Sequence, residues 1–172
     1  MATSIFSRKR DLVYLVHFCI GLPLMFLVDL QSLYPAHLVP SFMVNLKSYY
    51  ISTYNDLFFI SPPPFFKLYM WSELLYQAPV MLWAIPNLYN NSPKVPLVLL
   101  PFSCLIFITT LTCMIEYSFW SVPLQQKLDL STLYGPYLAL SAFMGIDMYG
   151  RISGVIDGAA AVARVKESKK LR

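Results

Sequence analysis

Four long apolar runs constrain the fold of this chain more than any other feature. They cover residues 12–28, 68–88, 95–115 and 133–149. A helix needs roughly 17–25 predominantly apolar residues to cross the hydrocarbon core of a bilayer. All four runs meet that requirement, so the sequence predicts an all-α polytopic membrane protein built as a four-transmembrane-helix bundle.

The composition agrees with a membrane protein. Hydrophobic residues make up 57% of the 172 residues and charged residues only 13%, whereas an average soluble domain carries roughly 25% charged residues. The length favours a single domain over residues 1–172. The net charge of +4 comes from basic residues near the two ends and not from a patch interleaved with aromatics, so it does not indicate nucleic-acid binding. We expect no disulfide framework, metal site or cofactor; the three cysteines lie inside apolar runs, at Cys19, Cys104 and Cys113.

Basic residues predict the orientation of the bundle. Ten of the thirteen Lys and Arg residues lie in residues 8–10, at Lys94 or after residue 150, and three lie in the other two loops. Because cytosolic segments carry the excess of Lys and Arg, we expect both termini to be cytosolic. The first run is longer than the apolar region of a signal peptide and no small-residue cleavage site follows it, so we interpret it as a retained helix. The sequon at residues 90–92 then faces the cytosol and should be unused.

The first loop and the tail add two further predictions. Phe42, Leu46, Tyr49 and Tyr50 recur at helical spacing within residues 30–66, which predicts an amphipathic lumenal helix on the membrane face or capping the bundle. The tail, residues 150–172, is basic and ends Lys169-Lys170-Leu171-Arg172. Lysines three and four residues from a cytosolic C-terminus match the dilysine retrieval pattern of endoplasmic reticulum proteins, which coat machinery reads. The alternative is a generic basic tail.

Two carboxyl groups occur where lipid disfavours them. Asp29 ends the first run and Glu73 lies inside the second, roughly 9 Å beyond Lys67 at 1.5 Å per residue. A charge inside a span costs at least ~2.5–3.5 kcal/mol and therefore indicates function, although Asp29 could instead reach the interface. Two carboxyl groups at one depth do not both ionise easily. We therefore expect a protonated Glu73 to donate to an ionised Asp29, which gives one negative charge suited to a lipophilic amine, whereas Asp147 near a helix end should be wet.

An ordered set of short motifs resembles a known family. It includes Asp29-Leu30-Gln31, Asp56, Glu73-Leu74-x-x-Gln77-x-Pro79 and Pro136-Tyr137-Leu138. This set is similar to the sigma-two receptor family, which carries the EXPERA domain shared with the emopamil-binding sterol isomerase. The resemblance implies a multi-pass endoplasmic reticulum protein, commonly a homodimer, with a lipid-accessible pocket for sterols and cationic amphiphiles and a role in sterol and lipid homeostasis or trafficking. Asp56 lacks the proline expected after it, and the chain after Tyr149 is longer and richer in Gly and Ala.

The same resemblance implies roles for individual residues. Asp29 would be the counter-ion of an amine, Glu73 its protonated partner, and Asp56 a support from the lumenal loop. The cavity would be lined by Tyr50, Gln77, Thr110 and Tyr137.

Three functions remain open on the sequence. The first is a protein that binds a sterol-like or amphiphilic ligand from the bilayer. The second is a sterol double-bond isomerase that uses Glu73 and Asp29 as proton donor and acceptor, which we favour less because we expect no histidine near that layer. The third is an endoplasmic reticulum surface factor that assists mitochondrial precursor targeting, to which fungal members of the resembled family are linked.

Overall fold

The computed structural model describes residues 4–170, except for the side chains of residues 165 and 168–170, and these residues form helices joined by short connections. The helical elements in chain order are η1 (Ile5–Ser7), α1 (Lys9–Leu27), η2 (Asp29–Leu33), η3 (Ala36–Leu38), α2 (Ser41–Tyr54), α3 (Leu57–Ile60), α4 (Pro64–Ser72), the π-helical turn η4 (Glu73–Gln77), α5 (Ala78–Tyr89), α6 (Val95–Ser118) and α7 (Leu124–Lys170).

All four predicted apolar runs are helical. Within the described residues, two segments are long and apolar enough to cross a membrane by themselves, Lys9–Leu33 and Val95–Ser118. The run at 68–88 lies in a continuous helical path that the turn η4 divides into α4 and α5. The run at 133–149 lies inside α7, which begins earlier and ends later than predicted. The all-α class is therefore confirmed, and the count of four crossings stays a prediction.

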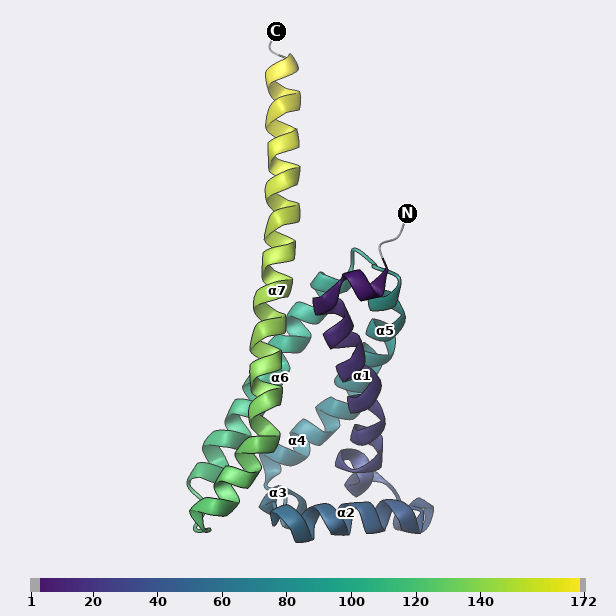
Figure 1. The fold of residues 1–172 in the computed structure, drawn as a ribbon, viewed down its shortest axis with the longest axis vertical. Helices are drawn as coiled ribbons and strands as arrows, with labels where there is room; N and C mark the ends of the chain where they lie inside the picture. Colours follow the sequence, from purple (N-terminus) through teal and green to yellow (C-terminus); the bar gives the residue numbers. More distant parts are fainter. Residues whose placement is uncertain (1–3, 171–172) are drawn as a thin grey trace.

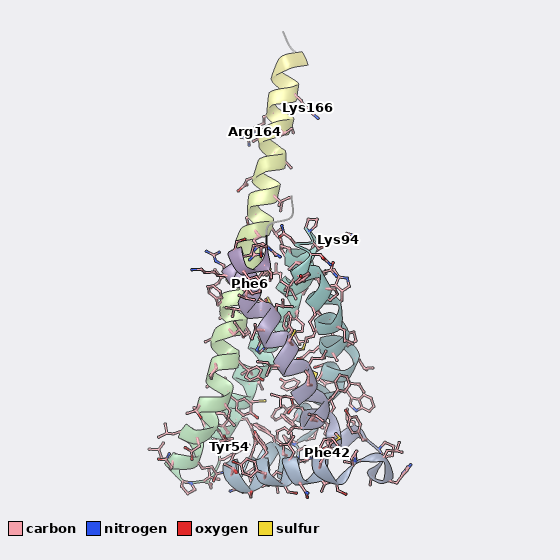
Figure 2. The ribbon with its side chains drawn as sticks, turned by 45° about the vertical axis from the view of Figure 1, so that its right-hand side comes forward. Phe6, Phe42, Tyr54, Lys94, Arg164 and Lys166 are labelled. Atoms are coloured by element: carbon pink, nitrogen blue, oxygen red, sulfur yellow. The ribbon has the colours of Figure 1, made fainter. Side chains whose placement is uncertain are left out.

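The long helices run side by side and α2 lies across one end of them (Figure 1). Helix α6 packs along α7, and α1 packs along α5. Both chain ends lie at the end opposite α2, and α7 extends well beyond the other helices there. Figure 2 places Phe6 and Lys94 at that end and Arg164 and Lys166 beyond it on α7, whereas Phe42 lies at the end formed by α2.

Two groups of buried side chains form the core. The larger joins α1, α5, α6 and α7 around fully buried Phe18 and Phe102, whose rings meet edge to face with centroids 5.5 Å apart. The smaller lies near α3, where Phe58 stacks on Phe66 at 4.7 Å and contacts Trp120 at 4.7 Å. The carboxyl groups described below lie near this second, aromatic cluster.

The predicted helix in the first loop is present as α2, and the predicted apolar residues divide between its two faces. Phe42 is 59% exposed and Tyr49 is 67% exposed, whereas Met43 is buried. The face turned to the bundle carries Met43, Lys47 and Tyr50, which share one side of a helix because they are spaced by four and three residues. Of the predicted apolar residues, Tyr50 lies on this inward face, whereas Phe42 and Tyr49 are exposed.

The tail is helical and continues α7 without a break. Beyond residue 154 the described side chains of this extension are exposed, and the apolar ones among them include Val155, Ile156 and Val162. The predicted retrieval signal falls on Lys169 and Lys170, whose side chains lie outside the described residues, so it stays a prediction.

A network of ion pairs closes the end of the bundle near the termini. Asp147 is 2.7 Å from both Arg10 and Arg151, and it accepts a hydrogen bond of 3.1 Å from the Tyr14 hydroxyl. Arg151 also lies 2.7 Å from Asp11. Asp147 is 7% exposed, so the expectation that it is wet is wrong: two helices enclose it and supply its cations.

Candidate functional site

Asp29 lies on a turn of 3₁₀ helix that follows α1. The N–H of Val28 donates to the Leu24 carbonyl at 2.9 Å, and the α-helical hydrogen-bond pattern ends there. The chain then continues as the 3₁₀ turn η2. Asp29 is the first residue of this turn and is half-buried. The end of α1 thus directs a carboxyl group toward the space above α2.

Glu73 begins the π-helical turn η4. The N–H of Ala78 donates to the Glu73 carbonyl, which is the five-residue spacing of a π turn. Such turns place one extra residue in a helix and occur frequently at functional sites. Glu73 Oε2 is buried and has no hydrogen-bond partner among the described residues.

The two carboxyl groups lie close enough for their charges to interact. The expected donation of a hydrogen bond from Glu73 to Asp29 stays a prediction. Because these charges interact, the end of α1 and the continuous path of α4, η4 and α5 border the same site.

Asp56 joins the elements of the first loop to α7 near this pair. It is fully buried at the start of α3 and accepts hydrogen bonds from the Phe58 N–H at 2.9 Å, the Tyr50 hydroxyl at 2.8 Å and the Tyr134 hydroxyl at 3.0 Å. Burial raises the pKa of Asp56, and these three donors oppose that change. Burial and then the charge of Asp56 raise the pKa of Tyr50. One side chain therefore joins α2, α3 and α7.

The remaining predicted residues divide into two groups. Tyr137 lies within electrostatic reach of Asp29 and Glu73, and its ring meets His17 edge to face at 5.3 Å. Gln77 is buried, but its amide donates to Ser72 Oγ at 3.4 Å. Thr110 is half-buried on α6, and no described contact connects it with the carboxyl groups. The structure thus brings the three acids near Tyr50 and Tyr137, whereas the places of Gln77 and Thr110 in the cavity stay predictions.

Lys47 is the site residue that the sequence interpretation missed. Its ammonium donates to Ser32 Oγ and lies 5.8 Å from the centre of the Phe59 ring. Burial lowers the pKa of Lys47, and the charge of Asp29 opposes that change. The sequence feature that could have identified Lys47 is its spacing from Tyr50, three residues along one helix.

Two other residues near the site were also missed as site residues. Tyr134, one turn before Tyr137 on α7, reaches Asp56. His17, expected to lie away from this layer, contacts it through Tyr137. Within the described residues, no group of three His, Cys, Asp or Glu side chains has a metal-binding arrangement.

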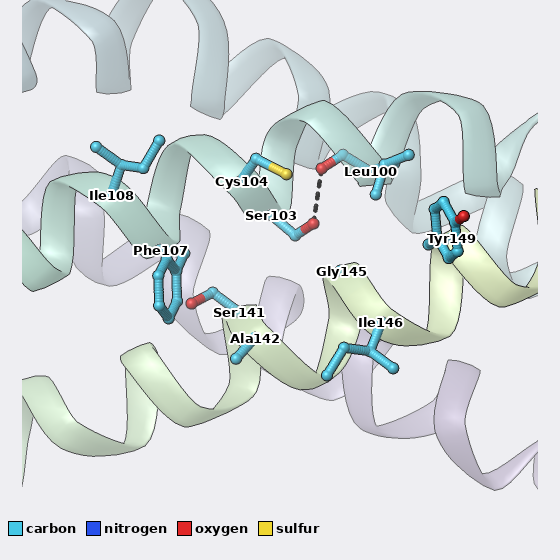
Figure 3. Close-up of a pocket in the computed structure, with 10 residues that line it drawn as sticks. All are labelled: Leu100, Ser103, Cys104, Phe107, Ile108, Ser141, Ala142, Gly145, Ile146 and Tyr149. Carbon is cyan, nitrogen blue, oxygen red and sulfur yellow. Dashed lines mark hydrogen bonds between the residues drawn. The ribbon is translucent and has the colours of Figure 1, made fainter.

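A hollow of about 440 Å³ lies between α6 and α7 (Figure 3). Small side chains open it: a Cβ at Gly145 would lie 3.2 Å from Ser103 Oγ, and that hydroxyl donates to the Leu100 carbonyl at 2.7 Å. A second cavity of about 10 Å³ shares Ser103 and Ser141 with the hollow and is also lined by His17 and Tyr137. Ser103 and Ser141 thus separate the hollow from a small cavity that Tyr137 lines.

These features define a class: an all-helical membrane protein that gathers carboxyl, phenol and ammonium groups at one end of a helix bundle. The sequence profile of the EXPERA family, described as the EXPanded EBP superfamily, matches residues 42–148, which is more than half of the chain. The chain belongs to this family.

Individual relatives agree with that assignment. Efficient mitochondria targeting-associated protein 19 of Schizosaccharomyces pombe is 32% identical over 114 residues, 65% of this chain and 60% of that protein. Sigma intracellular receptor 2 of Xenopus tropicalis is 24% identical over 155 residues, 84% of this chain and 91% of that protein. Sigma intracellular receptor 2 of Homo sapiens is 31% identical over 64 residues, 37% of this chain. The predicted resemblance to the sigma-two receptor family is confirmed.

Proposed function

We propose that this chain captures a sterol-like or cationic amphiphilic ligand from the bilayer at the site of Asp29 and Glu73, and acts in sterol and lipid homeostasis or trafficking. One observation carries the proposal: Glu73 Oε2 is buried without a hydrogen-bond partner among the described residues. A buried polar atom without a partner is costly. An oxygen kept in that condition is suited to a ligand that brings its own hydroxyl or ammonium donor.

The surroundings support a lipophilic ligand. Ligand sites in proteins are mostly apolar, hold a few convergent polar groups and enclose roughly 300–1,000 Å³. The hollow between α6 and α7 falls within that range, and the cavity beside it is lined by Tyr137, next to the acidic pair. Neither carboxyl group lines these two spaces, so a ligand held there would reach the carboxyl groups only past Tyr137.

We further propose four membrane crossings in the endoplasmic reticulum with both termini cytosolic. Both ends of the chain lie at one end of the bundle, as an even number of crossings requires. Lys94 lies there, Arg8 donates to the Leu88 carbonyl at the same end, and Arg164 and Lys166 follow on α7, which agrees with the positive-inside rule. A homodimer and recognition of Lys169 and Lys170 by coat machinery belong to the same proposal.

Native mass spectrometry of the purified protein with added cholesterol tests the ligand site. We expect the bound fraction to fall for Asp29→Asn and for Glu73→Gln, because each change removes an acceptor at the site. Glu116→Gln, an exposed carboxyl on α6, is the matched control and should bind as the wild type does. Unchanged binding by both site variants would remove the proposal.

A second candidate function is assistance to mitochondrial precursor targeting from the endoplasmic reticulum surface. The name of the fission yeast relative, a protein associated with efficient mitochondria targeting, favours it, as does the α7 extension with its exposed Val155, Ile156 and Val162. A growth and protein-import assay tests it by comparing a variant that lacks residues 155–172 with the variant Asp29→Asn. If the truncation abolishes function and Asp29→Asn leaves it intact, the targeting role replaces the ligand site.

A sterol isomerase would use the same two carboxyl groups, with Glu73 and Asp29 as donor and acceptor of the proton. His17 beside Tyr137 adds a proton-carrying group near them. The sterol isomer profile of a deletion strain decides this alternative: an accumulated double-bond isomer supports it, and an unchanged profile excludes it.

A further inference from the structure

Lys47 places a positive charge on the inward face of α2. Met43, one turn earlier on this face, is buried, and Tyr50, one turn later, donates to Asp56. The lysine stem therefore leaves the helix on the side that faces the carboxyl groups. Lys67 and Lys127, the two other basic residues toward this end of the bundle, lie outside the contacts of the site.

Two contacts hold the ammonium on the side of α2 that faces Asp29. Nζ donates to Ser32 Oγ and lies over the ring of Phe59. Ser32 follows Asp29 by three residues on η2, and side chains three residues apart on a 3₁₀ helix eclipse each other. The hydroxyl that anchors Lys47 thus shares a face with Asp29, whose charge acts on the lysine.

A resident cation changes what the site can recognise. Asp29 already has a positive charge nearby, so a second ammonium brought by a ligand would meet repulsion from Lys47. A neutral hydroxyl meets no such repulsion and can donate to the free Glu73 Oε2. The arrangement favours an uncharged polar head.

We propose that Lys47 is a built-in counter-ion of Asp29 that makes the site select neutral, hydroxyl-bearing lipids over cationic amphiphiles. The inference rests on the proposed ligand site and assigns its specificity. The ligand class is a sterol or a similar rigid lipid with a single hydroxyl group.

A matched pair of ligands tests this assignment. The first is cholesterol, and the second is the same skeleton with a dimethylamino group in place of the hydroxyl. Affinities are measured for wild type, Lys47→Met, Lys47→Arg, and the control Lys67→Met, which removes an exposed lysine at the same end of the bundle. Ser32→Ala removes the hydroxyl group that anchors the Lys47 ammonium and leaves its charge unchanged. This variant tests the same inference if Lys47→Met fails to fold.

We expect wild type, Lys47→Arg and Lys67→Met to prefer cholesterol. Lys47→Met should bind the amine at least about tenfold more tightly than wild type does, because a nearby like charge has gone, and Ser32→Ala should show a smaller gain. Adding Asp29→Asn to Lys47→Met should cancel the gain. If the amine affinity is unchanged in Lys47→Met and Ser32→Ala while cholesterol binding persists, the inference is overturned. Loss of both ligands in every variant and in wild type would instead overturn the ligand site itself.

Discussion

Asp56 has no access to solvent, yet its carboxyl group accepts three hydrogen bonds. Each donor belongs to a different element, so the interactions restrict how α2, α3 and α7 can move relative to one another. Hydrogen bonds to charged groups contribute roughly 1.5–3 kcal/mol each, and a buried donor left alone loses roughly 1–3 kcal/mol. The residue positions the Tyr50 and Tyr134 hydroxyl groups, and Tyr50 lies within electrostatic range of Asp29.

Replacing Asp56 by Ala should lower the free energy of unfolding by about 3 kcal/mol, because the start of α3 loses its cap and two buried hydroxyl groups lose their acceptor. Thermal unfolding in detergent measures this. Asp129→Ala, a carboxyl that accepts one exposed hydrogen bond from Gln125, is the control and should change stability little. Equal losses in the two variants would contradict the structural role of Asp56.

The sequence identifies the acids of the site more readily than its lysine. Asp29 and Glu73 stand out because a charge beside or inside a long apolar run is costly and rare. Lys47 lies in a loop of mixed composition, where a lysine is ordinary. Its direction depends on the helical register of α2, and the predicted apolar residues Phe42 and Tyr49 are exposed in the structure and do not identify the inward face.

At the scale of elements, apolar runs predicted where helices occur and not how they begin or end. The third run matches α6 within a few residues. Helix α7 instead continues past both ends of its run, because the flanking residues are compatible with a helix although they are too polar for lipid. The turn η4 could not be predicted, since one inserted residue in an apolar run leaves the hydropathy unchanged.

Deleting Leu75 should abolish ligand binding without unfolding the protein. Leu75 is 71% exposed within η4, so its loss removes little packing. The deletion converts the π turn to an α turn, because the Glu73 carbonyl then accepts from the Ala78 N–H at the four-residue spacing, and it removes the local widening of the helix at Glu73. Cholesterol binding by native mass spectrometry is the measurement, and Leu75→Ala, which keeps the length, is the control. Binding retained by the deletion would show that η4 does not position Glu73.

The ion network joins α1 to α7, and Asp147 lies at its centre. Asp147→Asn should lower stability by about 2–3 kcal/mol, below the ~3–5 kcal/mol of a fully buried pair because Arg10 is largely exposed. Thermal unfolding measures the loss. Asp157→Asn, an exposed carboxyl ten residues further along α7, provides the comparison. If Asp147→Asn and Asp157→Asn unfold at the same temperature, the ion network makes no measurable contribution to stability.

The whole molecule is polarised along its long axis. Ion pairs and both chain ends occupy one end, whereas the acids, the phenols and the crossing helix α2 occupy the other. A ligand site near α2 and a helix projecting from the opposite end can therefore serve separate partners. If the proposed orientation holds, the first lies toward the lumen and the second lies in the cytosol.

Glycosylation mapping tests that orientation. Phe119 ends α6 at the α2 end of the molecule and is 82% exposed, and Phe119→Asn completes a sequon with Trp120 and Ser121. Expressed in eukaryotic cells, this variant should gain a glycan that an endoglycosidase removes, because only lumenal sequons are modified. Wild type, whose sequon at Asn90 lies at the opposite end, should gain none, and adding Ser121→Ala to Phe119→Asn should abolish the shift. A glycan on wild type that Asn90→Gln eliminates would instead place α2 in the cytosol and reverse the orientation.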